Sequence, residues 1–497
     1  MVRSAFIGAI AGMALGVPWL ALLYAGARVL GVPFAPFELF DRLVRLLPGP
    51  AIAALIETLV RALQTARLGA TAELAHTVEA ALAVGLTLTG LGVFGAIHGA
   101  LSWRAESRAP HRSLALGAAM GLTLGLLITQ PGAGLLWGLA LGWVRREWLA
   151  LPEAAPVNLA RRRWLRRVGV GAAALTILGL GLERWLKRPE SETMGVPVAP
   201  TPHPLTGFLP VPGTRPEITP IADFYQVDIK LDPPPLDSAT WALEVGGLVR
   251  RPLKLTYAEL IALPTVEFDA TLECISNTVG GDLISTTRFS GVPLREVLGR
   301  AGLTPEVLDI AFICADGYSE SLPVEAALDP GTVLCVAMGG APLTPEHGYP
   351  VRVFTPNRFG MKNPKWITRI EAMSDDYQGF WERRGWREAG WVKTTSVIDA
   401  ARRNGAVLIE AGGVAYAGAR GVQSVEVRVD DGDWVAAELK PALSPLTWVL
   451  WRVSLESMPG THRLTVRATD GNGARQTERK TIPFPEGATG YHHLTVT

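Results

Sequence analysis

Long apolar segments crowded before residue 190 constrain the fold of this chain more than any other feature of its sequence. The runs from Ala5 to Ala27 and from Val78 to Leu101 each reach the length of about 20 residues that a helix needs to cross a bilayer. Mean hydropathy over the chain is +0.23, and the apolar excess lies in this part. The pattern predicts a membrane-embedded region followed by a soluble one.

Three further runs complete the predicted membrane region. Leu114 to Ile128 and Leu135 to Val144 are separated by the helix breaker Thr129-Gln130-Pro131-Gly132, which predicts two short helices, with one re-entrant hairpin as the alternative. Val168 to Leu182 is a fifth candidate. Phe37 to Leu68 is amphipathic, as expected of a segment that lies in the interface or packs on the bundle. We therefore expect an α-helical bundle of about five spans over residues 1–188.

The arginines orient this bundle, because loops rich in positive charge stay on the cytoplasmic side. Three loops after the second span carry clusters: Arg104, Arg108 and Arg112; Arg145 and Arg146; Arg161 to Arg167. If these loops are cytoplasmic, an odd number of spans places the soluble part outside the cell. The segment between residues 31 and 77 departs from this rule, since its arginines would be external.

A sharper signal lies in Arg161-Arg162-Arg163-Trp164-Leu165-Arg166, which resembles a twin-arginine export signal. That pathway exports proteins that have already folded. A plain positive-inside anchor is the alternative. The prolines between Pro189 and Pro220 then predict a linker over residues 189–220.

The region 221–390 has a mixed α+β pattern and holds all three cysteines. Val266 to Leu272 reads as a strand that leads into Cys274, and Thr256 to Leu263 as a short helix with Thr256 as N-cap and Glu259 closing a capping box. Cys314 and Cys335 lie in apolar runs and are expected to be buried strand residues. An odd, sparse set of cysteines argues against a disulfide framework and a structural zinc site.

Four motifs in this region resemble the sulfite oxidase family of molybdopterin enzymes. They are Leu272-Glu273-Cys274-Ile275-Ser276-Asn277; Thr287-Arg288-Phe289-Ser290-Gly291; His347-Gly-Tyr-Pro-Val-Arg352 with Gly360-Met-Lys362-Asn-Pro-Lys365-Trp366; and Asp376-Tyr377-Gln378-Gly379-Phe380. The resemblance runs from about Phe224 to the C-terminus. It implies a molybdenum–molybdopterin cofactor whose metal takes one soft protein ligand, the thiolate of Cys274.

The resemblance also assigns roles around that ligand. His347, Arg352, Lys362 and Lys365 are expected around the pterin phosphate, where arginine offers a bidentate fork and lysine a point charge. Tyr225 and Gln226 fall in the segment that lines the pterin. Asp316 would hydrogen-bond the pterin ring or form an Asx turn. Tyr377 would stand at the substrate pocket and hydrogen-bond an oxyanion or oxo group.

One departure concerns the substrate. Relatives carry an arginine for the anionic substrate at the positions that Val227 or Gln226 occupies here, and this chain has neither. Arg288, or an arginine of the C-terminal region, would have to replace it. Sulfite as the physiological substrate is therefore in doubt.

Residues 391–497 read as an all-β domain. Val425, Val427 and Val429 alternate with polar neighbours before the hairpin turn Asp431-Gly432, and Leu464, Val466 and Ala468 repeat the pattern. We expect an immunoglobulin-like sandwich. The segments Gly412 to Gly418 and Ser444 to Trp448 resemble the family's dimerisation domain, which implies a homodimer.

The sequence thus predicts a redox enzyme that exchanges an oxo group with a small substrate and passes electrons to a separate carrier, a cytochrome c or a membrane carrier. The chain has no C-x-x-C-H haem motif, and His98 is the only histidine in a predicted span. The net charge of +1 gives no reason to expect a nucleic-acid partner. Two alternatives remain: a reductase of S-oxides or N-oxides with the same cofactor, and a non-catalytic membrane-tethered scaffold.

Overall fold

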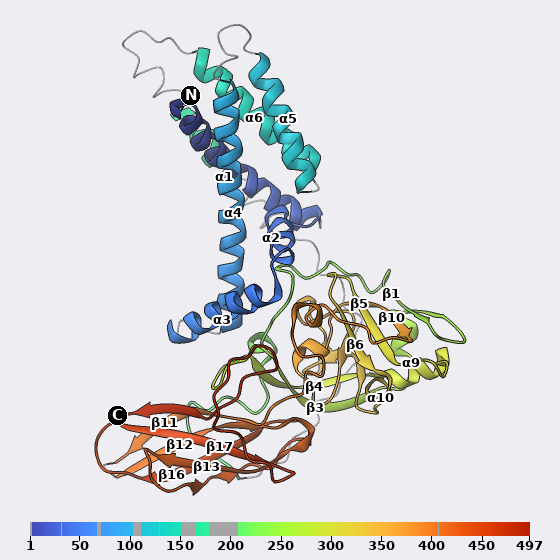
Figure 1. Cartoon of the computed structure of the whole chain (residues 1–497), viewed down its shortest axis with the longest axis vertical. Coiled ribbons are helices and arrows are strands. Elements are labelled where there is room, and N and C mark those ends of the chain that lie inside the picture. The colour runs from blue at the N-terminus through green and yellow to red at the C-terminus, as the bar shows by residue number, and fades with distance from the viewer. Residues whose placement is uncertain are drawn as a thin grey trace. The chain divides into compact units, whose positions relative to one another are not determined.

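The computed structural model describes residues 2–30, 32–66, 71–102, 111–128, 130–150, 166–167, 169–177, 207–405 and 407–497 (Figure 1). By contacts the chain divides into two compact units. The first comprises Met1–Leu47, His76–Glu190 and Lys230–Asp232, and the second comprises Pro48–Ala75, Ser191–Ile229 and Pro233–Thr497. The predicted twin-arginine pair and its neighbours 163–165, and the first half of the predicted linker, lie outside the described residues.

The N-terminal region is helical, as predicted. Its helices are α1 (Val2–Leu30), α2 (Ala35–Arg45), α3 (Gly49–Ala66), α4 (Thr71–Ser102), α5 (His111–Leu127) and α6 (Pro131–Ala150). The predicted break between two short helices is confirmed, since α5 ends at Leu127 and α6 begins at Pro131, a favoured first residue of a helix.

Two of the described helices are long and apolar enough to cross a membrane, Ser4–Leu30 and Leu74–Ser102, each with a mean hydropathy of 2.0. The sequence predicted about five spans, so the structure supports fewer of them. Helix α5 has only 17 residues, and α6 carries the charged sequence Arg145-Arg146-Glu147 in its C-terminal half. Of the fifth predicted span, only the helical stretch 169–177 belongs to the described residues.

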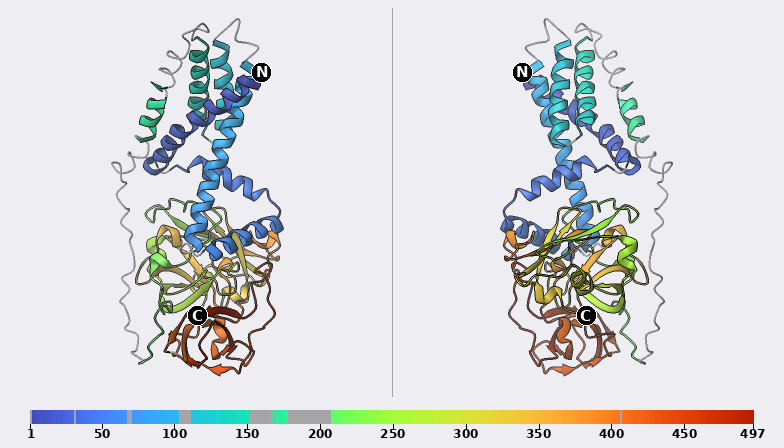
Figure 2. Two further views of the ribbon diagram at one scale, coloured as in Figure 1. Left: turned by 90° about the vertical axis from the view of Figure 1, so that its left-hand side faces the viewer. Right: turned by 90° about the vertical axis from the view of Figure 1, so that its right-hand side faces the viewer.

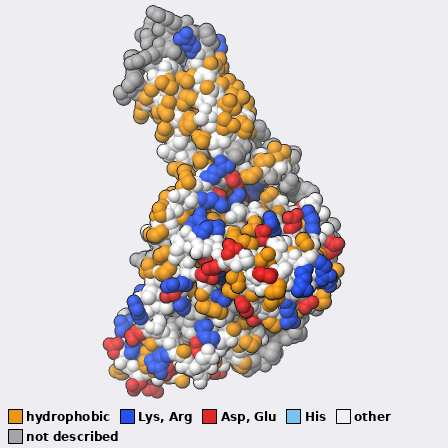
Figure 3. Space-filling view, turned by 45° about the vertical axis from the view of Figure 1, so that its right-hand side comes forward, with side chains coloured by type: hydrophobic (Ala, Val, Ile, Leu, Met, Phe, Trp, Pro, Cys, Tyr) orange, Lys and Arg blue, Asp and Glu red, His pale blue; other side chains and the backbone are white. Residues whose placement is uncertain are grey.

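Glycines bring the helices of the first unit into backbone contact. A β-carbon at Gly8 of α1 would lie 2.1 Å from the carbonyl oxygen of Gly95 in α4, and one at Gly117 of α5 would lie 2.3 Å from that of Gly138 in α6. Small residues that let helix backbones approach this closely are typical of helices that pack in membranes. Apolar side chains such as Phe6, Leu86 and Leu136 are exposed on these helices. Figure 3 shows hydrophobic side chains gathered on the surface of the helical region, with few charged ones among them.

His98 of α4 is buried in the first unit, and its Nε2 lies 3.0 Å from the carbonyl oxygen of Ser113 in α5. The buried Arg145 of α6 donates to the hydroxyl of Ser4 in α1 at 2.5 Å. The histidine that the sequence places in a predicted span thus has a protein partner.

Two sheets build the middle of the chain (Figures 1 and 2). The first has the order β2-β1-β10-β5-β6, in which β1 and β10 are parallel and the other neighbours antiparallel. Its strands are β2 (Leu253–Thr256), β1 (Ala242–Gly247), β10 (Ile367–Met373), β5 (Asp309–Cys314) and β6 (Ser319–Pro323). The second has the order β3-β4-β7-β8, with β9 also paired to β7. Its strands are β3 (Val266–Glu273), β4 (Ile284–Pro293), β7 (Val333–Met338), β8 (Ala341–Pro342) and β9 (Arg352–Phe354).

Short helices cover and connect these sheets. Helix α8 (Tyr257–Ile261) begins with the predicted capping box, in which Thr256 and Glu259 satisfy each other's backbone amides. Helices α9 (Leu294–Ala301) and α10 (Val324–Ala327) follow β4 and β6. Side chains from both sheets and these helices share one core, which includes Leu243, Leu298, Phe312, Leu334 and Ile370.

The C-terminal strands form two four-stranded antiparallel sheets around a common core, which Figure 2 shows in orange and red. One sheet has the order β11-β12-β16-β15: β11 (Thr395–Asn404), β12 (Leu408–Tyr416), β16 (Val449–Glu456) and β15 (Glu438–Leu439). The other has the order β14-β13-β17-β18: β14 (Val435–Ala436), β13 (Val422–Val429), β17 (His462–Asp470) and β18 (His492–Val496). The predicted all-β character and the hairpin at Asp431-Gly432, between β13 and β14, are confirmed.

The described part of the predicted linker, residues 207–220, packs on these sheets. Arg215 forms an ion pair with Asp399 of β11 at 2.6 Å, and the indole of Trp448 donates to the carbonyl of Glu217 at 2.9 Å. Val211 is buried. This stretch is therefore held in place rather than free in solvent.

Candidate active site

Cys274 follows β3 directly and stands at the start of a tightly bonded loop. Its amide donates to the carbonyl of Leu283 at 2.9 Å, and its own carbonyl accepts from the amide of Asn277 at 3.0 Å. The side chain of Asn277 bridges the loop, donating to the carboxylate of Glu273 at 2.9 Å and accepting from the amide of Leu283 at 3.1 Å. The thiol of Cys274 is buried and lies 2.9 Å from the hydroxyl of Ser276.

The other two cysteines have no such setting. Cys314 ends β5 and Cys335 lies in β7, both buried in the cores of the sheets. The prediction that these two are buried strand residues is confirmed. Burial raises the pKa of the Cys335 thiol to about 12.

Tyr225 closes one side of the cysteine loop. It follows the short helix η1 (Ile221–Asp223), its amide donates to the hydroxyl of Ser285 at 3.1 Å, and its ring stacks on Phe224. Burial, and then the proximity of Cys274, raise the pKa of its phenol. Its hydroxyl also lies against Gly360, where a β-carbon would approach it to 2.6 Å.

Arg352 and Lys365 supply buried positive charge near Tyr225. Arg352 begins β9 and is 5% exposed; it donates to the carbonyl of His347 at 3.3 Å, while its Nε has no partner among the described residues. Lys365 donates to the carbonyl of Glu346 at 2.7 Å and forms an ion pair with Asp228. Burial lowers the pKa of both side chains.

His347 stands at the end of the short helix η2 (Pro345–His347), with its ring against Phe224. Burial, and then Lys365 and Arg352, lower its pKa to about 4, so the imidazole is neutral near pH 7. Its Nε2 lies 3.3 Å from the carbonyl of Ile221. Because a carbonyl only accepts, Nε2 carries the proton and Nδ1 is an acceptor. The expected contact of His347 with the pterin phosphate stays a prediction.

Gln226 and Asp316 meet the same group, Asp228. The amide of Gln226 donates to Asp228 at 2.8 Å. Asp316 follows β5 and accepts from the amide of Tyr318 at 2.9 Å, which is the Asx turn that was one of its two predicted roles. Burial, with Asp228 among its neighbours, raises the pKa of Asp316 to about 6.

Lys362 and Tyr377 contact other groups. Lys362, at the end of η3 (Gly360–Lys362), bonds Glu320 and Glu382 in a buried cluster. The backbone of Tyr377 bonds Ser321 and Asp309, and the guanidinium of Arg383 lies 5.9 Å from its ring centroid. These contacts do not bring either side chain to Cys274.

Arg288 also lies away from the cysteine. On β4 it faces Asp269 of β3 and forms a bidentate ion pair with it, with two nitrogen–oxygen distances of 2.9 Å. Asp269 precedes Cys274 by five residues of extended strand, which is a separation of roughly 16 Å. The predicted catalytic role of Arg288 is therefore not supported, because its charge is already matched by Asp269.

Two site residues were not predicted, Glu273 and Asp228. Burial raises the pKa of Glu273 to about 7, and its Oε2 has no partner among the described residues. Asp228 joins Gln226 and Lys365. A buried lysine needs a counter-charge, which is the one signal that could have pointed to Asp228.

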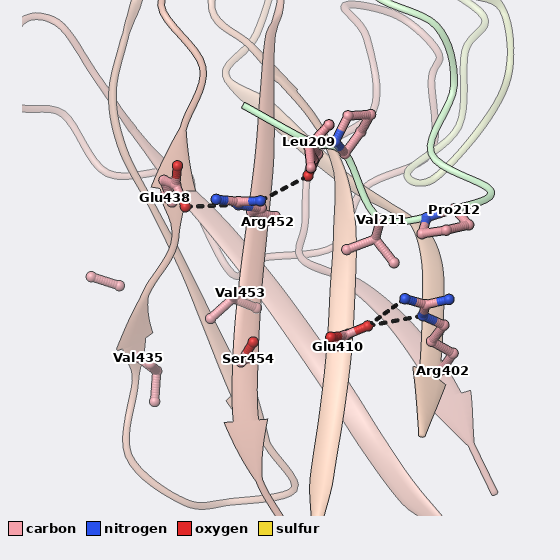
Figure 4. Close-up of a pocket in the computed structure, with 12 residues that line it drawn as sticks. Leu209, Val211, Pro212, Arg402, Glu410, Val435, Glu438, Arg452, Val453 and Ser454 are labelled. Atoms are coloured by element: carbon pink, nitrogen blue, oxygen red, sulfur yellow. Dashed lines mark hydrogen bonds and ion pairs between the residues drawn. The ribbon is translucent and has the colours of Figure 1, made fainter. Parts of the chain in front are cut away.

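A groove of about 670 Å³ lies elsewhere, on the sheet of β11, β12 and β16 (Figure 4). The segment Leu209–Pro212 runs along it, and Figure 4 shows ion pairs of Arg402 with Glu410 and of Arg452 with Glu438. Its lining contains none of the predicted site residues.

The group around Cys274 fits a molybdopterin. It joins one soft thiol for a metal to two buried cations, and the unpartnered Nε of Arg352 suits an anionic phosphate. Burial raises the pKa of the Cys274 thiol, so a metal that takes the thiolate must displace its proton.

Comparison with known proteins agrees with this chemistry. Residues 230–381 match the family model of the oxidoreductase molybdopterin binding domain. The NAD(P)H nitrate reductase of Hordeum vulgare is 30% identical over 315 residues, covering 50% of this chain and 35% of that protein. An NADH nitrate reductase of Oryza sativa subsp. japonica is 29% identical over 312 residues, covering 49% and 34%. The chain thus spans about a third of the length of these relatives.

The fold resembles that of the sulfane dehydrogenase SoxCD from Paracoccus pantotrophus, with a TM-score of 0.50, 21% identity, and coverage of 63% of this chain and 94% of that one. Residues 230–381 therefore form an oxidoreductase molybdopterin binding domain. The cofactor of this domain is molybdenum–molybdopterin.

Proposed function

We propose that this chain is a membrane-anchored oxidoreductase that transfers an oxo group to or from a small substrate and exchanges electrons with an external carrier. The observation that carries the proposal is the hydrogen-bonded loop that holds the buried Cys274 thiol, with Tyr225 close to both that thiol and Arg352. When bound, the cofactor supplies the two-electron oxo exchange, and the protein contributes orientation and electrostatics.

The residues of the chain then have separate tasks. Cys274 would hold the metal, in a loop that Asn277 keeps rigid. Arg352 and Lys365 would neutralise the pterin phosphate, and Asp228 would keep Lys365 oriented. Neutral His347 would orient the backbone of Ile221 rather than add charge.

Reduction of S-oxides or N-oxides is the second candidate. Gln226 and Val227 stand where relatives carry an anion-binding arginine, and Gln226 is bonded to the carboxylate of Asp228. An acidic neighbour disfavours an anionic substrate such as sulfite, whereas a neutral sulfoxide does not suffer this repulsion. A panel of sulfite, sulfoxides and N-oxides with artificial electron donors and acceptors would separate the two directions.

The partners and location belong to the same proposal. Helices α1 and α4 would anchor the chain in the cell membrane. With the odd number of spans expected from the sequence, the arginine clusters would place the catalytic domain on the extracytoplasmic side. Electrons would pass singly to a cytochrome c or a membrane carrier. The C-terminal sheets would form an immunoglobulin-like domain through which two chains pair.

The test compares two buried cysteines. Cys274→Ala should abolish turnover and lower the molybdenum content, while the fold survives because the loop bonds of Asn277 do not use the thiol. Cys314→Ala is the matched control, which should cost only stability, since that thiol lies in the core. Full turnover with a normal metal content in Cys274→Ala would refute the assignment, and absence of metal from the wild-type protein would favour a scaffold.

A further inference from the structure

Lys362 lies in a buried cluster of charges behind the active site. Its side chain is 1% exposed, and its ammonium contacts Glu320 at 2.7 Å, the carbonyl of Ser321 at 3.1 Å, and Glu382. The two carboxylates are equally buried. Each partner comes from a different element: Lys362 from η3, Glu320 from β6 and Glu382 from η4 (Glu382–Arg384).

The cluster is closed by further hydrogen bonds. The hydroxyl of Tyr318 lies 3.1 Å from Glu320 and 2.7 Å from the carbonyl of Met361 in η3. Burial of ion pairs is costly and is often no better for stability than apolar packing. A buried cluster of this kind is therefore expected to fix geometry, since charges in a dry interior tolerate little displacement.

Through η3, the cluster contacts residues that flank Cys274. Lys362 ends a helix of three residues whose first residue is Gly360. A β-carbon at Gly360 would lie 2.6 Å from the hydroxyl of Tyr225 and 3.5 Å from the carbonyl of Glu273. A shift of η3 would therefore move directly against the residues that flank Cys274.

The cluster also contacts the segment of Tyr377. Glu382 accepts from the amide of Gly379 at 2.6 Å, and the hydroxyl of Ser321 donates to the carbonyl of Tyr377 at 2.7 Å. A β-carbon at Gly379 would lie 2.6 Å from the carboxylate of Glu320. The cluster therefore holds the backbone of this segment at two adjacent points.

We propose that Lys362 is a positioning residue whose ion pairs with Glu320 and Glu382 set the separation between η3 and the Tyr377–Gly379 segment, and so the width of the substrate pocket. Lys362 then makes no contact with the pterin phosphate, unlike Lys365. The inference rests on the proposed function, and it takes Tyr377 as a residue of the substrate pocket, as the family resemblance implies.

The first test compares Lys362→Met with Lys365→Met in the full chain. Lys362→Met should keep the pterin and molybdenum content of the wild type but lose roughly 10- to 100-fold in kcat/KM, the size of effect expected when reacting groups are misplaced. Most of the loss should fall in KM if the pocket widens. Lys365→Met should instead lose pterin. Equal loss of pterin in both variants, or unchanged kinetics in Lys362→Met, would overturn the proposal.

The second test does not need activity. Hydrogen exchange followed by mass spectrometry should show faster exchange at residues 377–381 and 360–363 in Lys362→Met but not in Lys365→Met. If Lys362→Met fails to fold, Lys362→Met with Glu320→Gln, which removes one opposing charge, takes its place. Unchanged exchange in these segments would contradict the inference, whereas absence of molybdenum from the wild-type protein would contradict only the proposed function.

Discussion

Lys362 and Lys365 lie three residues apart in the sequence, but they have different partners in the structure, and we expect them to have different roles. Lys365 pairs with one carboxylate, Asp228, and lies near Arg352, and burial lowers its pKa. Lys362 pairs with two carboxylates. Burial lowers its pKa, but the charges of Glu320 and Glu382 outweigh burial, so the pKa of Lys362 is raised overall. Lys365 retains capacity for a further anion, and Lys362 is neutralised within the protein.

Substrate charge gives the first prediction. Val227 is 43% exposed, so Val227→Arg adds a cation that solvent and ligand can both reach. The KM of the Val227→Arg variant for sulfite should be roughly 2- to 5-fold lower than that of the wild type, which is the effect of an exposed ion pair. The KM for dimethyl sulfoxide should stay unchanged. Steady-state assays with an artificial acceptor or donor measure both constants.

Gln226→Arg is the matched control for that prediction. An arginine at this position meets Asp228, the present partner of Gln226, and should be neutralised by it. The KM for sulfite should therefore change less than in Val227→Arg. A larger gain from Gln226→Arg, or a wild-type KM already as low as in arginine-containing relatives, would show that another residue binds the anion.

The resemblance to a known family assigns roles to Cys274, Arg352 and Lys365, because these residues lie inside the matching motifs. Those roles stay predictions. Asp228, Glu320 and Glu382 were not predicted. A carboxylate that pairs with a buried lysine can come from any part of the sequence, because only the fold brings the two residues together. The ion pair of Arg288 with Asp269 could not be predicted for the same reason, because the two residues become adjacent only when β3 pairs with β4.

At the scale of elements, the C-terminal domain covers the free edge of β3. The hydroxyl of Tyr416 donates to the carbonyl of Thr271 at 3.0 Å, and the hydroxyl of Ser444 donates to that of Asp269 at 2.6 Å. Strand β18 reaches the cysteine loop, where a β-carbon at Gly280 would lie 2.3 Å from the ring of His492. The strand that delivers Cys274 is therefore supported from a second domain.

The pH dependence of stability tests this contact. Burial, and then His493 and Arg215, lower the pKa of His492 from 6.5 to about 4. Folding thus favours the neutral ring, and its stabilisation is present above pH 6.5 and lost as the pH falls towards 4. Relative to His492→Asn, which keeps an acceptor for the amide of Ile398, the wild type should lose at most about 1.4 kcal/mol per pH unit in that window. Thermal melting at pH 7.5 and 5 measures it.

His462 provides a control of opposite sign. Its hydrogen bond to Asp430 raises its pKa, so its contribution is present below pH 6.5 and is lost as the pH rises through the raised value. The wild type should therefore gain stability relative to His462→Asn as the pH falls. If the melting temperatures of both variants change with pH in parallel with that of the wild type, folding does not shift the pKa of either ring.

For the whole molecule, the sequence predicted the helical region, the mixed middle domain and the C-terminal sheets in order. Periodicity was enough there, because apolar runs and alternating strands are local signals, as the capping box at Thr256 and the hairpin at Asp431 illustrate. The number of spans was less predictable. Hydropathy alone did not separate the 17-residue α5, packed on α6 through Gly117, from a helix that crosses a membrane.

Topology is the prediction for the whole chain. If the number of spans is odd and the arginine clusters at 104–112, 145–146 and 161–167 are cytoplasmic, Thr497 lies outside the cytoplasm, so a reporter active only there, fused after Thr497, should be active. Changing both Arg161 and Arg162 to Lys keeps the charge, so it should block export only if the twin-arginine pathway reads the pair. The matched control, Arg166→Lys with Arg167→Lys, should export normally. An inactive reporter on the wild type would reverse the topology. Normal export of the variant with Arg161→Lys and Arg162→Lys would show that the segment acts only as a charged anchor, because a positive-inside signal does not distinguish arginine from lysine.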